Sequence, residues 1–251
     1  MRGRVLSILV AERLYIYRCA GRTPNPGPHG FEPEEVVTSH MVVVEKKRGR
    51  GRPPIHEDDV LLEAAFKAFA ASGYDGMSVR AVAEELGLSH GALNRRFGGK
   101  HEIFEAAVNH GFRDMLAAMA AEQSSRLEPA DDLAALREII RSFMVVNQDR
   151  PEFGQLMNLE GLRRSPQLEF IFHQSMAAFV PLVSPLLRRL EKAGLIYPLS
   201  TREMFFLVAH GAEAPFVLAG ISSHFDDIDG PLDAEAHIQA MTDLIMRGIT
   251  R

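Results

Sequence analysis

Residues 78–100 read SVRAVAEELGLSHGALNRRFGGK, and this stretch decides the fold of the chain. A first helix is expected after Ser78, a residue type favoured at helix N-caps, because apolar residues follow at helical spacing: Val79, Val82, Ala83 and Leu86. Gly87 is expected to end this helix, and Ser89 is expected to cap the next helix only two residues later. So short a Gly-containing connection predicts a helix-turn-helix.

The helix after Ser89 has two faces of opposite character. Leu93 and Phe97 share one face, which predicts that they pack against the preceding helices. On the other face small residues allow close approach of the backbone, and Arg and Asn carry donors that suit guanine and adenine edges in the major groove. We therefore predict DNA contacts from His90, Gly91, Ala92, Asn94, Arg95 and Arg96.

The flanking segments extend this unit. Upstream, a helix from Asp58 to Gly73 is predicted by the apolar stripe Leu61, Ala64, Ala65, Ala68 and Phe69. Downstream, Lys100 opens a helix with apolar residues at Ile103, Phe104, Ala107 and Val108. The N-terminal amides of that helix and Lys100 can together hold a DNA phosphate.

Residues 60–103 resemble the DNA-binding domain of the TetR/AcrR family of transcriptional regulators. The resemblance lies in Val60-Leu61, Ala64-Ala65, Phe69, Gly73-Tyr74, Ser78-Val79, Val82-Ala83, Leu86-Gly87-Leu88-Ser89, Gly91, Leu93, Phe97, Lys100 and Ile103. It implies an all-α fold with an N-terminal three-helix helix-turn-helix DNA-binding domain and a larger helical ligand-binding and dimerisation domain. It also implies phosphate contacts from Ser78 and Lys100 and a recognition helix at 89–96, which adds Ser89 to the DNA-binding set.

Two positions depart from the family pattern. Asn94 stands where the family usually has Tyr, and Arg96 stands where it often has Tyr or His. An aromatic phosphate contact is therefore expected to be missing, and we expect Arg96 and a basic arm upstream to compensate. Base reading by Asn94 is the alternative.

The basic arm is the segment 46–52, KKRGRGR, with five cations in seven residues. Arg50-Gly51-Arg52-Pro53 resembles the core of an AT-hook, whose arginines enter the narrow minor groove of A·T-rich DNA. We predict that Arg48, Arg50 and Arg52 contact DNA, and a solvated tail is the alternative.

Charge and cysteine content restrict the class of protein. The net charge of −5 divides along the chain into zero for 1–45, +3 for 46–100 and −8 for 101–251, so only the front is suited to a polyanion. A single cysteine, Cys19, allows no internal disulfide, which predicts a cytoplasmic protein. No apolar run reaches the roughly 20 residues of a membrane span.

The chain divides into four predicted parts. The Pro-rich run Thr23–Pro28 predicts that the first part is disordered, and one hypothesis is that translation begins at Met41. The parts are a disordered extension (1–45), the AT-hook-like arm (46–57), the helix-turn-helix domain (58–104) and the helical ligand-binding and dimerisation domain (105–251).

Helical periodicity continues through the rear of the chain. Helices are predicted at 105–123, 131–148, 151–162, 166–193, 201–220 and 233–248. Pro181 and Pro185 are expected to kink or break the fourth of these. The family resemblance implies that the last two helices, 201–220 and 233–248, form a four-helix interface in a homodimer.

Soft apolar side chains are abundant in the rear domain, where most are expected to be core. Met and Phe also pack adaptably around apolar ligands in pockets between helices. The predicted ligand-binding residues are Phe143, Met144, Met157, Phe172, Met176 and Phe179. The chain has no glycine-rich nucleotide fingerprint, no P-loop and no cysteine pair, so no cofactor and no enzymatic activity are predicted.

Three polar features are considered as candidate metal-binding sites. Glu169 with His173, and His210 with Glu213, each share a helix face and could supply metal ligands. Ordinary helical surface pairs are the favoured interpretation, so no metal site is predicted. Residues 226–230, DDIDG, lack the terminal glutamate of a calcium loop and are expected to form an acidic surface loop.

The sequence thus predicts a ligand-responsive, DNA-binding transcriptional regulator: a dimeric repressor that a small molecule releases from its operator. Its predicted partners are double-stranded DNA with an inverted-repeat operator, a second copy of the chain, and an unidentified small, largely apolar inducer. An architectural protein of A·T tracts with little sequence specificity is the first alternative. A metal-dependent enzyme using His173, His210 and Glu213 is the second.

Overall fold

The structure is a computed structural model that describes residues 57–251. The predicted extension 1–45 and the arm residues Arg48, Arg50 and Arg52 lie outside the described residues. In the described part every element is helical, apart from an isolated bridge between Ile196 and Thr250. The predicted all-α fold is confirmed for this part of the chain.

Helices α2 to α4 and the start of α5 form the N-terminal unit: α2 (Asp58–Gly76), α3 (Val79–Glu85), α4 (Ala92–Phe97) and α5 (Lys100–Ser124). Ser78 caps α3 as predicted, because its Oγ accepts a hydrogen bond from the Ala81 amide at 3.3 Å. Gly73 and Gly87 adopt φ of 70° and 66°, a left-handed region that favours glycine. The break at Gly73 interrupts α2 one turn before its end.

The predicted cap of the recognition helix is wrong. Helix α4 begins at Ala92 after Gly91, and the Ser89 side chain caps no amide there. Instead the Ser89 carbonyl accepts from the Ala92 amide at 2.8 Å, and its hydroxyl accepts from the Arg95 guanidinium. A tight turn over 89–92 therefore replaces the first helical turn that the sequence predicts.

The core of this unit is built from the predicted apolar stripes. Leu61, Phe69, Leu93 and Phe104 are almost wholly buried, whereas Phe97 is half-buried at the edge of the cluster. The Phe104 ring lies 5.0 Å from Phe69, 5.2 Å from Tyr74 and, by a further contact of 6.2 Å, against Phe170 of the rear domain. This aromatic cluster therefore joins the two halves of the molecule.

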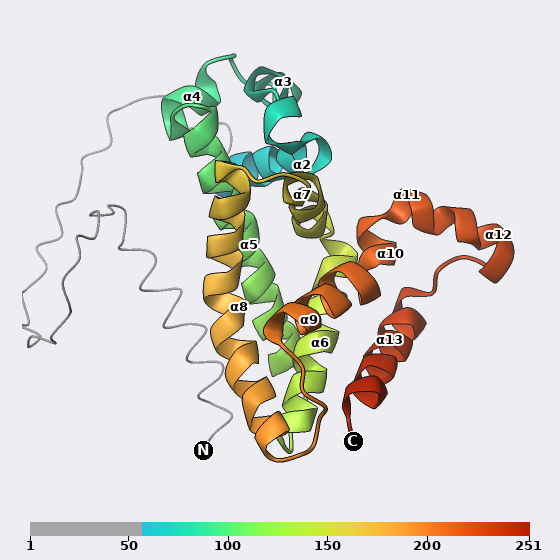
Figure 1. Cartoon of the computed structure of the whole chain (residues 1–251). Coiled ribbons are helices and arrows are strands. Elements are labelled where there is room, and N and C mark those ends of the chain that lie inside the picture. The colour runs from blue at the N-terminus through green and yellow to red at the C-terminus, as the bar shows by residue number, and fades with distance from the viewer. Residues whose placement is uncertain (1–56) are drawn as a thin grey trace, which may run out of the picture.

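Helix α5 crosses the boundary predicted at 104/105 without interruption. Its buried residues run from Ile103 to Met119, because one apolar stripe faces α2 first and the rear helices afterwards. Figure 1 shows α5, α6 (Asp132–Asp149) and α8 (Pro166–Lys192) side by side, with α3 and α4 at one end. The N-terminal unit is therefore continuous with the rear domain rather than separated by a linker.

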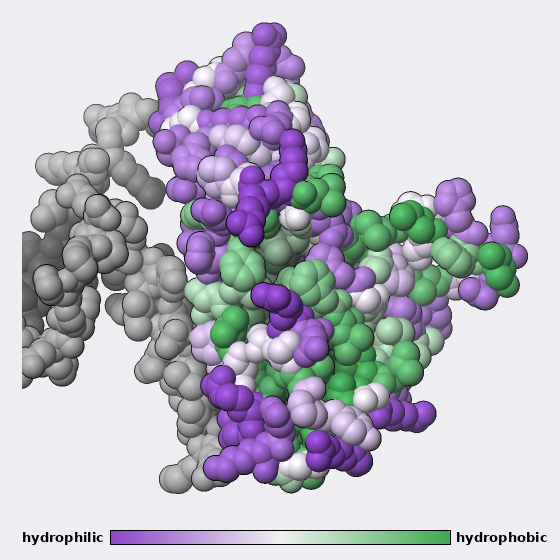
Figure 2. Space-filling model, in the orientation of Figure 1, coloured by the Kyte–Doolittle hydropathy of each residue, from purple (hydrophilic) through white to green (hydrophobic). Residues whose placement is uncertain are grey.

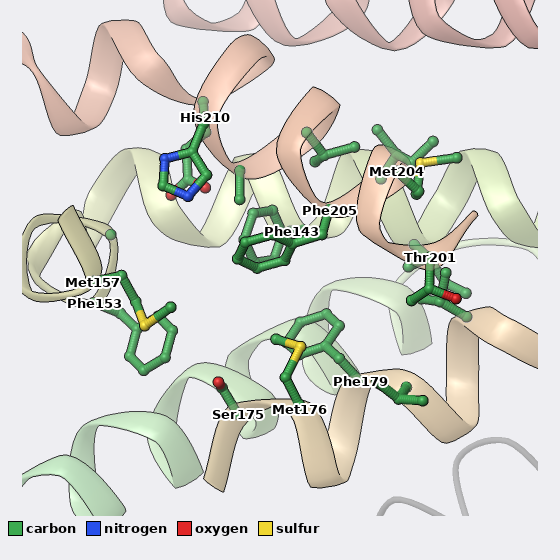
Figure 3. Close-up of a pocket in the computed structure, with 18 residues that line it drawn as sticks. Phe143, Phe153, Met157, Ser175, Met176, Phe179, Thr201, Met204, Phe205 and His210 are labelled. Atoms are coloured by element: carbon green, nitrogen blue, oxygen red, sulfur yellow. The ribbon is translucent and has the colours of Figure 1, made fainter. Parts of the chain in front are cut away.

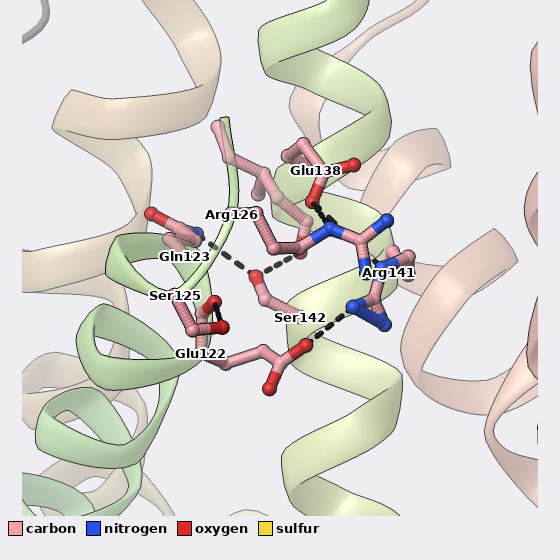
Figure 4. Close-up of polar contacts among 8 residues, drawn as sticks. Glu122, Gln123, Ser125, Arg126, Glu138, Arg141 and Ser142 are labelled. Carbon is pink, nitrogen blue, oxygen red and sulfur yellow. Dashed lines mark hydrogen bonds and ion pairs between the residues drawn. The ribbon is translucent and has the colours of Figure 1, made fainter. Parts of the chain in front are cut away.

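Polar contacts fix α5 against α6 (Figure 4). Gln123 Nε2 donates to the buried Ser142 Oγ at 2.8 Å, and Arg126 pairs with Glu138 at 3.2 Å. Arg141 of α6 reaches back to Glu122 of α5. Because several of these groups are partly or wholly buried, their mutual pairing sets the register of the two helices.

The next predicted helices occur close to their expected bounds: α6, α7 (Glu152–Gly161) and α8. The two halves of α8, Pro166–Ala177 and Phe179–Lys192, meet at 53°. Pro181 lacks the amide that would bond to the carbonyl four residues earlier, and its ring clashes there, so the bend falls where proline requires it. The predicted kink is confirmed.

The single helix predicted at 201–220 is wrong. The segment is divided into α9 (Thr201–Phe206), the π-helical turn η1 (Leu207–Ala212), α10 (Ala214–Val217) and α11 (Ala219–Ser222). Pro215 has no amide to donate, and Leu218 leaves helical dihedrals with φ −104° and ψ 45°. The wider π turn η1 contacts α6 and α13.

The remaining C-terminal elements are η2 (Ser223–Phe225), α12 (Asp226–Asp229) and α13 (Ala234–Ile249). Residues 226–229 form an exposed helical turn. The predicted surface exposure is therefore confirmed, whereas the predicted loop conformation is wrong. Helix α13 matches its prediction and packs on α6. Within 57–251 no single helix is long and apolar enough to cross a membrane, and only the bent α8 pair passes by length and composition.

Candidate nucleic-acid interface and apolar pocket

The end of the molecule that carries α3 and α4 is hydrophilic. Figure 2 shows mostly hydrophilic residues over this end, whereas apolar residues gather over the half that carries α9 and α13. Ser89, His90, Asn94, Arg95 and Arg96 are exposed. Gly91, Ala92 and Lys100 are half-buried beside them. The structure therefore brings the predicted recognition residues together on one surface.

Arg95 is folded back on its own helix. Its Nη2 donates to Ser89 Oγ at 2.8 Å, and a Cβ built on Gly91 would lie 2.8 Å from its Nη1. Gly91 thus leaves the space in which the guanidinium rests. Rotation away from Ser89 would direct the same donors outward, toward a base edge.

The cations at the margins of the surface already contact acidic residues. Arg96 pairs with Asp58 at the start of α2, and its guanidinium lies 5.9 Å from the Phe97 ring. His90 Nδ1 lies 3.4 Å from Glu84, which also pairs with Arg80 at 3.0 Å. These exposed pairs are weak and can exchange for phosphate contacts.

Ser78 and Lys100 lie at helix starts. The Ser78 hydroxyl is engaged in capping α3 and remains exposed. Lys100 Nζ donates to the Asp75 carbonyl at 3.2 Å and lies 5.0 Å above the Tyr74 ring. Lys100 is therefore held over the turn that follows α2, beside the N-terminus of α5.

Sequence reasoning missed the contact between this turn and the rear domain. The Tyr74 amide donates to Glu160 Oε1 of α7 at 2.7 Å, and Arg163 lies 3.8 Å from Asp75. No periodicity or spacing in the sequence relates residues that lie 86 positions apart. The contact ties the segment beneath Lys100 to α7.

A second polar cluster lies between α2 and α5. The buried His110 has Glu63, Asp59 and Asp114 within 3.4 to 3.6 Å, and Arg113 lies 3.3 Å from its Nδ1. Glu63, His110 and Asp114 are the one group of three close metal-type ligands in the described part of the chain. Arg150 also approaches Asp114, at 3.8 Å, so the cluster is an ion-pair network that already contains its own cations.

The rear domain contains an apolar pocket between α6, α7, α8, α9 and η1. It encloses about 840 Å³ of empty space, part of which is open to solvent. The lining residues are Ile139, Ile140, Phe143, Phe153, Gly154, Met157, Ser175, Met176, Phe179, Val180, Val183, Thr201, Met204, Phe205, Val208, Ala209, His210 and Glu213. A mostly apolar lining with a few polar groups is typical of small-molecule sites.

Four of the six predicted ligand-binding residues line this pocket: Phe143, Met157, Met176 and Phe179. Figure 3 shows them pointing into one space from three helices, with His210 at one end and Thr201 with Met204 at the other. Met144 is fully buried in the core on the other side of α6, and Phe172 is 47% exposed on α8. Neither of these two lines the pocket, because helical rotation carries them to other faces.

The two predicted His/Glu pairs do not meet. Glu169 and His173 are exposed on α8, whereas His210 and Glu213 lie in the pocket wall. Within the described residues these four side chains form no group close enough to hold a metal. The four side chains therefore do not form the metal site that a metal-dependent enzyme would need from them.

Glu213 is the unusual member of the wall. It is 1% exposed, and its Oε1 has no hydrogen-bond partner among the described residues. Burial raises the pKa of the Glu213 carboxyl to about 8, and burial lowers the pKa of His210. Both groups are therefore largely uncharged near pH 7.

Comparisons with known proteins agree with this geometry. Residues 61–107 match the family model of bacterial regulatory proteins, tetR family. The chain is 26% identical over 159 residues to the HTH-type transcriptional regulator RutR of Escherichia coli K12, covering 63% of this chain and 73% of that protein. It is 29% identical over 133 residues to the HTH-type transcriptional repressor AcnR of Corynebacterium glutamicum, covering 50% of this chain and 62% of that protein.

Solved structures share the fold. The ketosteroid transcriptional regulator KstR2 of Mycobacterium tuberculosis superposes with a TM-score of 0.55 at 18% identity, covering 79% of this chain and 97% of that one. A TetR family transcription regulator of Marinobacter aquaeolei gives 0.57 at 16% identity, covering 76% and 93%. The family match coincides with the helix-turn-helix unit described above, and the matches together support a transcriptional regulator of the TetR family.

Proposed function

We propose that this regulator is a dimeric repressor that a small, largely apolar molecule releases from an inverted-repeat operator. The observation that carries the proposal is the contact between Glu160 and the Tyr74 amide. Helix α7 lines the pocket through Phe153, Gly154 and Met157, and the same helix bonds to the turn beneath Lys100. A ligand that shifts α7 therefore acts on the DNA-binding end through a direct contact.

Ligand release follows from differential affinity. DNA favours the dimer geometry that sets two recognition helices about 34 Å apart, and the ligand favours another separation. A molecule that binds both states equally shifts neither population. Operator affinity should therefore fall when the pocket is occupied, and unchanged affinity with an occupied pocket would contradict release.

Exposed apolar side chains on the C-terminal elements support a second copy of the chain as the partner. The large ones are Phe206, Leu207, Leu218, Ile221, Phe225, Ile228, Leu232 and Leu244. Leu244 is 62% exposed on α13 although the opposite face of that helix is buried. Such surface favours a closed two-fold interface.

The oligomeric state is tested by analytical ultracentrifugation of the full chain and of Leu244→Glu. We expect a dimer for the natural sequence and a shift toward monomer for the variant. Gln239→Glu, which adds an acidic side chain to an exposed position on another side of the same helix, is the control and should remain dimeric. A monomeric natural chain would contradict the proposal.

The operator is tested by selection from a randomised duplex library with the full chain at near-physiological salt. An enriched inverted repeat supports a dimeric, sequence-specific regulator. Enrichment of A·T tracts without symmetry would instead favour an architectural protein that acts through its basic arm. We place the protein in the cytoplasm, because its proposed partner is bacterial chromosomal DNA.

A further inference from the structure

Few polar side chains line the pocket, and its only carboxyl or ammonium-type group among the described residues is acidic. Among the described residues that line it, the side chains with polar groups are Ser175, Thr201, His210 and Glu213, and no Lys or Arg is present. Ser175 Oγ donates to the Ile171 carbonyl at 2.8 Å, and Thr201 Oγ1 shares a hydrogen bond with Ser184. These two hydroxyls are engaged within the protein.

Glu213 differs because its Oε1 is buried and has no partner. That atom faces α7, where a Cβ built on Gly154 would lie 3.4 Å from it. A buried polar atom without a partner costs free energy, so a partner such as a water molecule, an ion or a ligand is expected to complete it. The wall of the pocket therefore contains one unmatched acidic group.

The charges of the side chains that line the pocket exclude anionic ligands. An anion in this pocket would meet no described cation, and desolvation of an unpaired charge is very costly. His210 does not supply that charge near pH 7, because burial lowers its pKa. Fatty acids, phosphates and other carboxylates are therefore poor candidates.

The aromatic rings of the lining and the acidic Glu213 suit an organic cation. Four phenylalanine rings surround the space: Phe143, Phe153, Phe179 and Phe205. Aromatic faces attract organic cations, and the attraction increases when water is excluded. A neutral ligand could be held by a hydroxyl or an amide, whereas only an acidic side chain supplies a counter-charge.

We propose that the pocket binds a lipophilic organic cation, an amine or quaternary ammonium with an aromatic or alkyl body, whose positive charge lies beside the Glu213 carboxylate. The inference rests on the proposed function, in which this pocket is the inducer site. The aromatic rings contact the body and the flanks of the cationic group. Binding requires that Glu213 lose its proton to solvent.

That proton release gives the proposal a distinct signature. A quaternary ammonium keeps its charge at every pH, so a change in its affinity with pH reports the protein alone. The titratable groups near Glu213 are His210 on η1 and His237 of α13, whose Nε2 donates to the Ala212 carbonyl at 2.8 Å. With a carboxyl pKa of about 8, affinity should rise roughly tenfold from about pH 7 to about pH 9.

The experiment is calorimetric titration of the full chain with benzyltrimethylammonium and with neopentylbenzene, its uncharged isostere. We expect the cation to bind at least about tenfold more tightly than the isostere at pH 9. Glu213→Gln should abolish both this preference and the pH dependence. Glu191→Gln, which removes the same charge from an exposed position on α8, should change neither.

The outcomes separate the cation inference from the proposed function. Equal affinity for the two probes, or cation affinity unchanged in Glu213→Gln, overturns the inference but leaves the pocket as a ligand site. Absence of binding by both probes overturns the inference and counts against the pocket as an inducer site. The pH series on the natural chain keeps the test decisive even if Glu213→Gln fails to fold.

Discussion

The Glu160 carboxylate of α7 accepts a 2.7 Å hydrogen bond from the Tyr74 backbone amide, one residue after the break in α2. The Tyr74 ring in turn lies 5.0 Å beneath Lys100 Nζ at the start of α5. A residue of α7, the helix that lines the pocket through Phe153, Gly154 and Met157, thus meets the DNA-binding end at one turn. Helix α5, which begins at Lys100 and continues into the rear domain, is one connection between the two ends, and α7 is a second.

Removal of that carboxylate should loosen the turn. Glu160→Ala deletes a charged hydrogen bond worth about 1.5 kcal/mol, so the Tyr74 amide should exchange its hydrogen roughly tenfold faster. Amide exchange followed by NMR gives the rate. Glu152→Ala, at the other end of α7, is the matched control, and equal exchange in both variants would rule out the coupling.

Arg95 and Lys100 should affect DNA binding in different ways. Arg95→Ala should cost about 1–3 kcal/mol on the selected operator and relax its sequence preference, because the guanidinium reads base edges. Lys100→Ala should weaken all sequences alike and reduce the salt slope by about 1, because it holds a phosphate. Fluorescence anisotropy on specific and random duplexes distinguishes the two, and identical behaviour would refute this division of roles.

Gly111 should be a sensitive position for stability. A Cβ at Gly111 would lie 2.5 to 2.7 Å from ring atoms of the buried Phe66, so Gly111→Ala should separate α5 from α2 and cost about 1–3 kcal/mol of unfolding free energy. Gly161 at the end of α7 has open space around its Cβ position. There Gly→Ala should be neutral or stabilising by about 0.5–1 kcal/mol. Urea denaturation measures both, and a loss at Gly161 equal to that at Gly111 would contradict the steric argument.

Glu213 should make stability depend on pH. Burial raises the pKa of its carboxyl from 4.5 to about 8, so the folded chain holds a proton that the unfolded chain releases above pH 4.5. The contribution is therefore fully present below pH 4.5 and is lost as the pH rises to 8, by up to about 1.4 kcal/mol per pH unit. Glu213→Gln should flatten this slope in urea denaturation between about pH 5.5 and 7.5. An unchanged slope would show that Glu213 ionises normally.

The site was only partly predictable from sequence. The recognition surface was predictable because residues 89–97 form a local unit in which helical rotation separates Leu93 from Arg95. The sequence predicted that an apolar pocket lies between the rear helices, but it did not predict which residues line it. Phe172 and Met144 are as apolar as Phe179 and Phe143. Yet Phe172 is exposed and Met144 lies in the core.

By itself the sequence determined the helical class, the helix-turn-helix, the resemblance to the TetR family, the kink in α8 and the bounds of α6 and α13. These features depend on interactions within a few residues: caps, glycine turns, proline and apolar periodicity. Only the tertiary structure decided the π turn of η1, the burial of Glu213 without a partner and the bond between Glu160 and Tyr74. Each of these depends on which helices pack together, and packing joins residues whose separation along the chain carries no local signal.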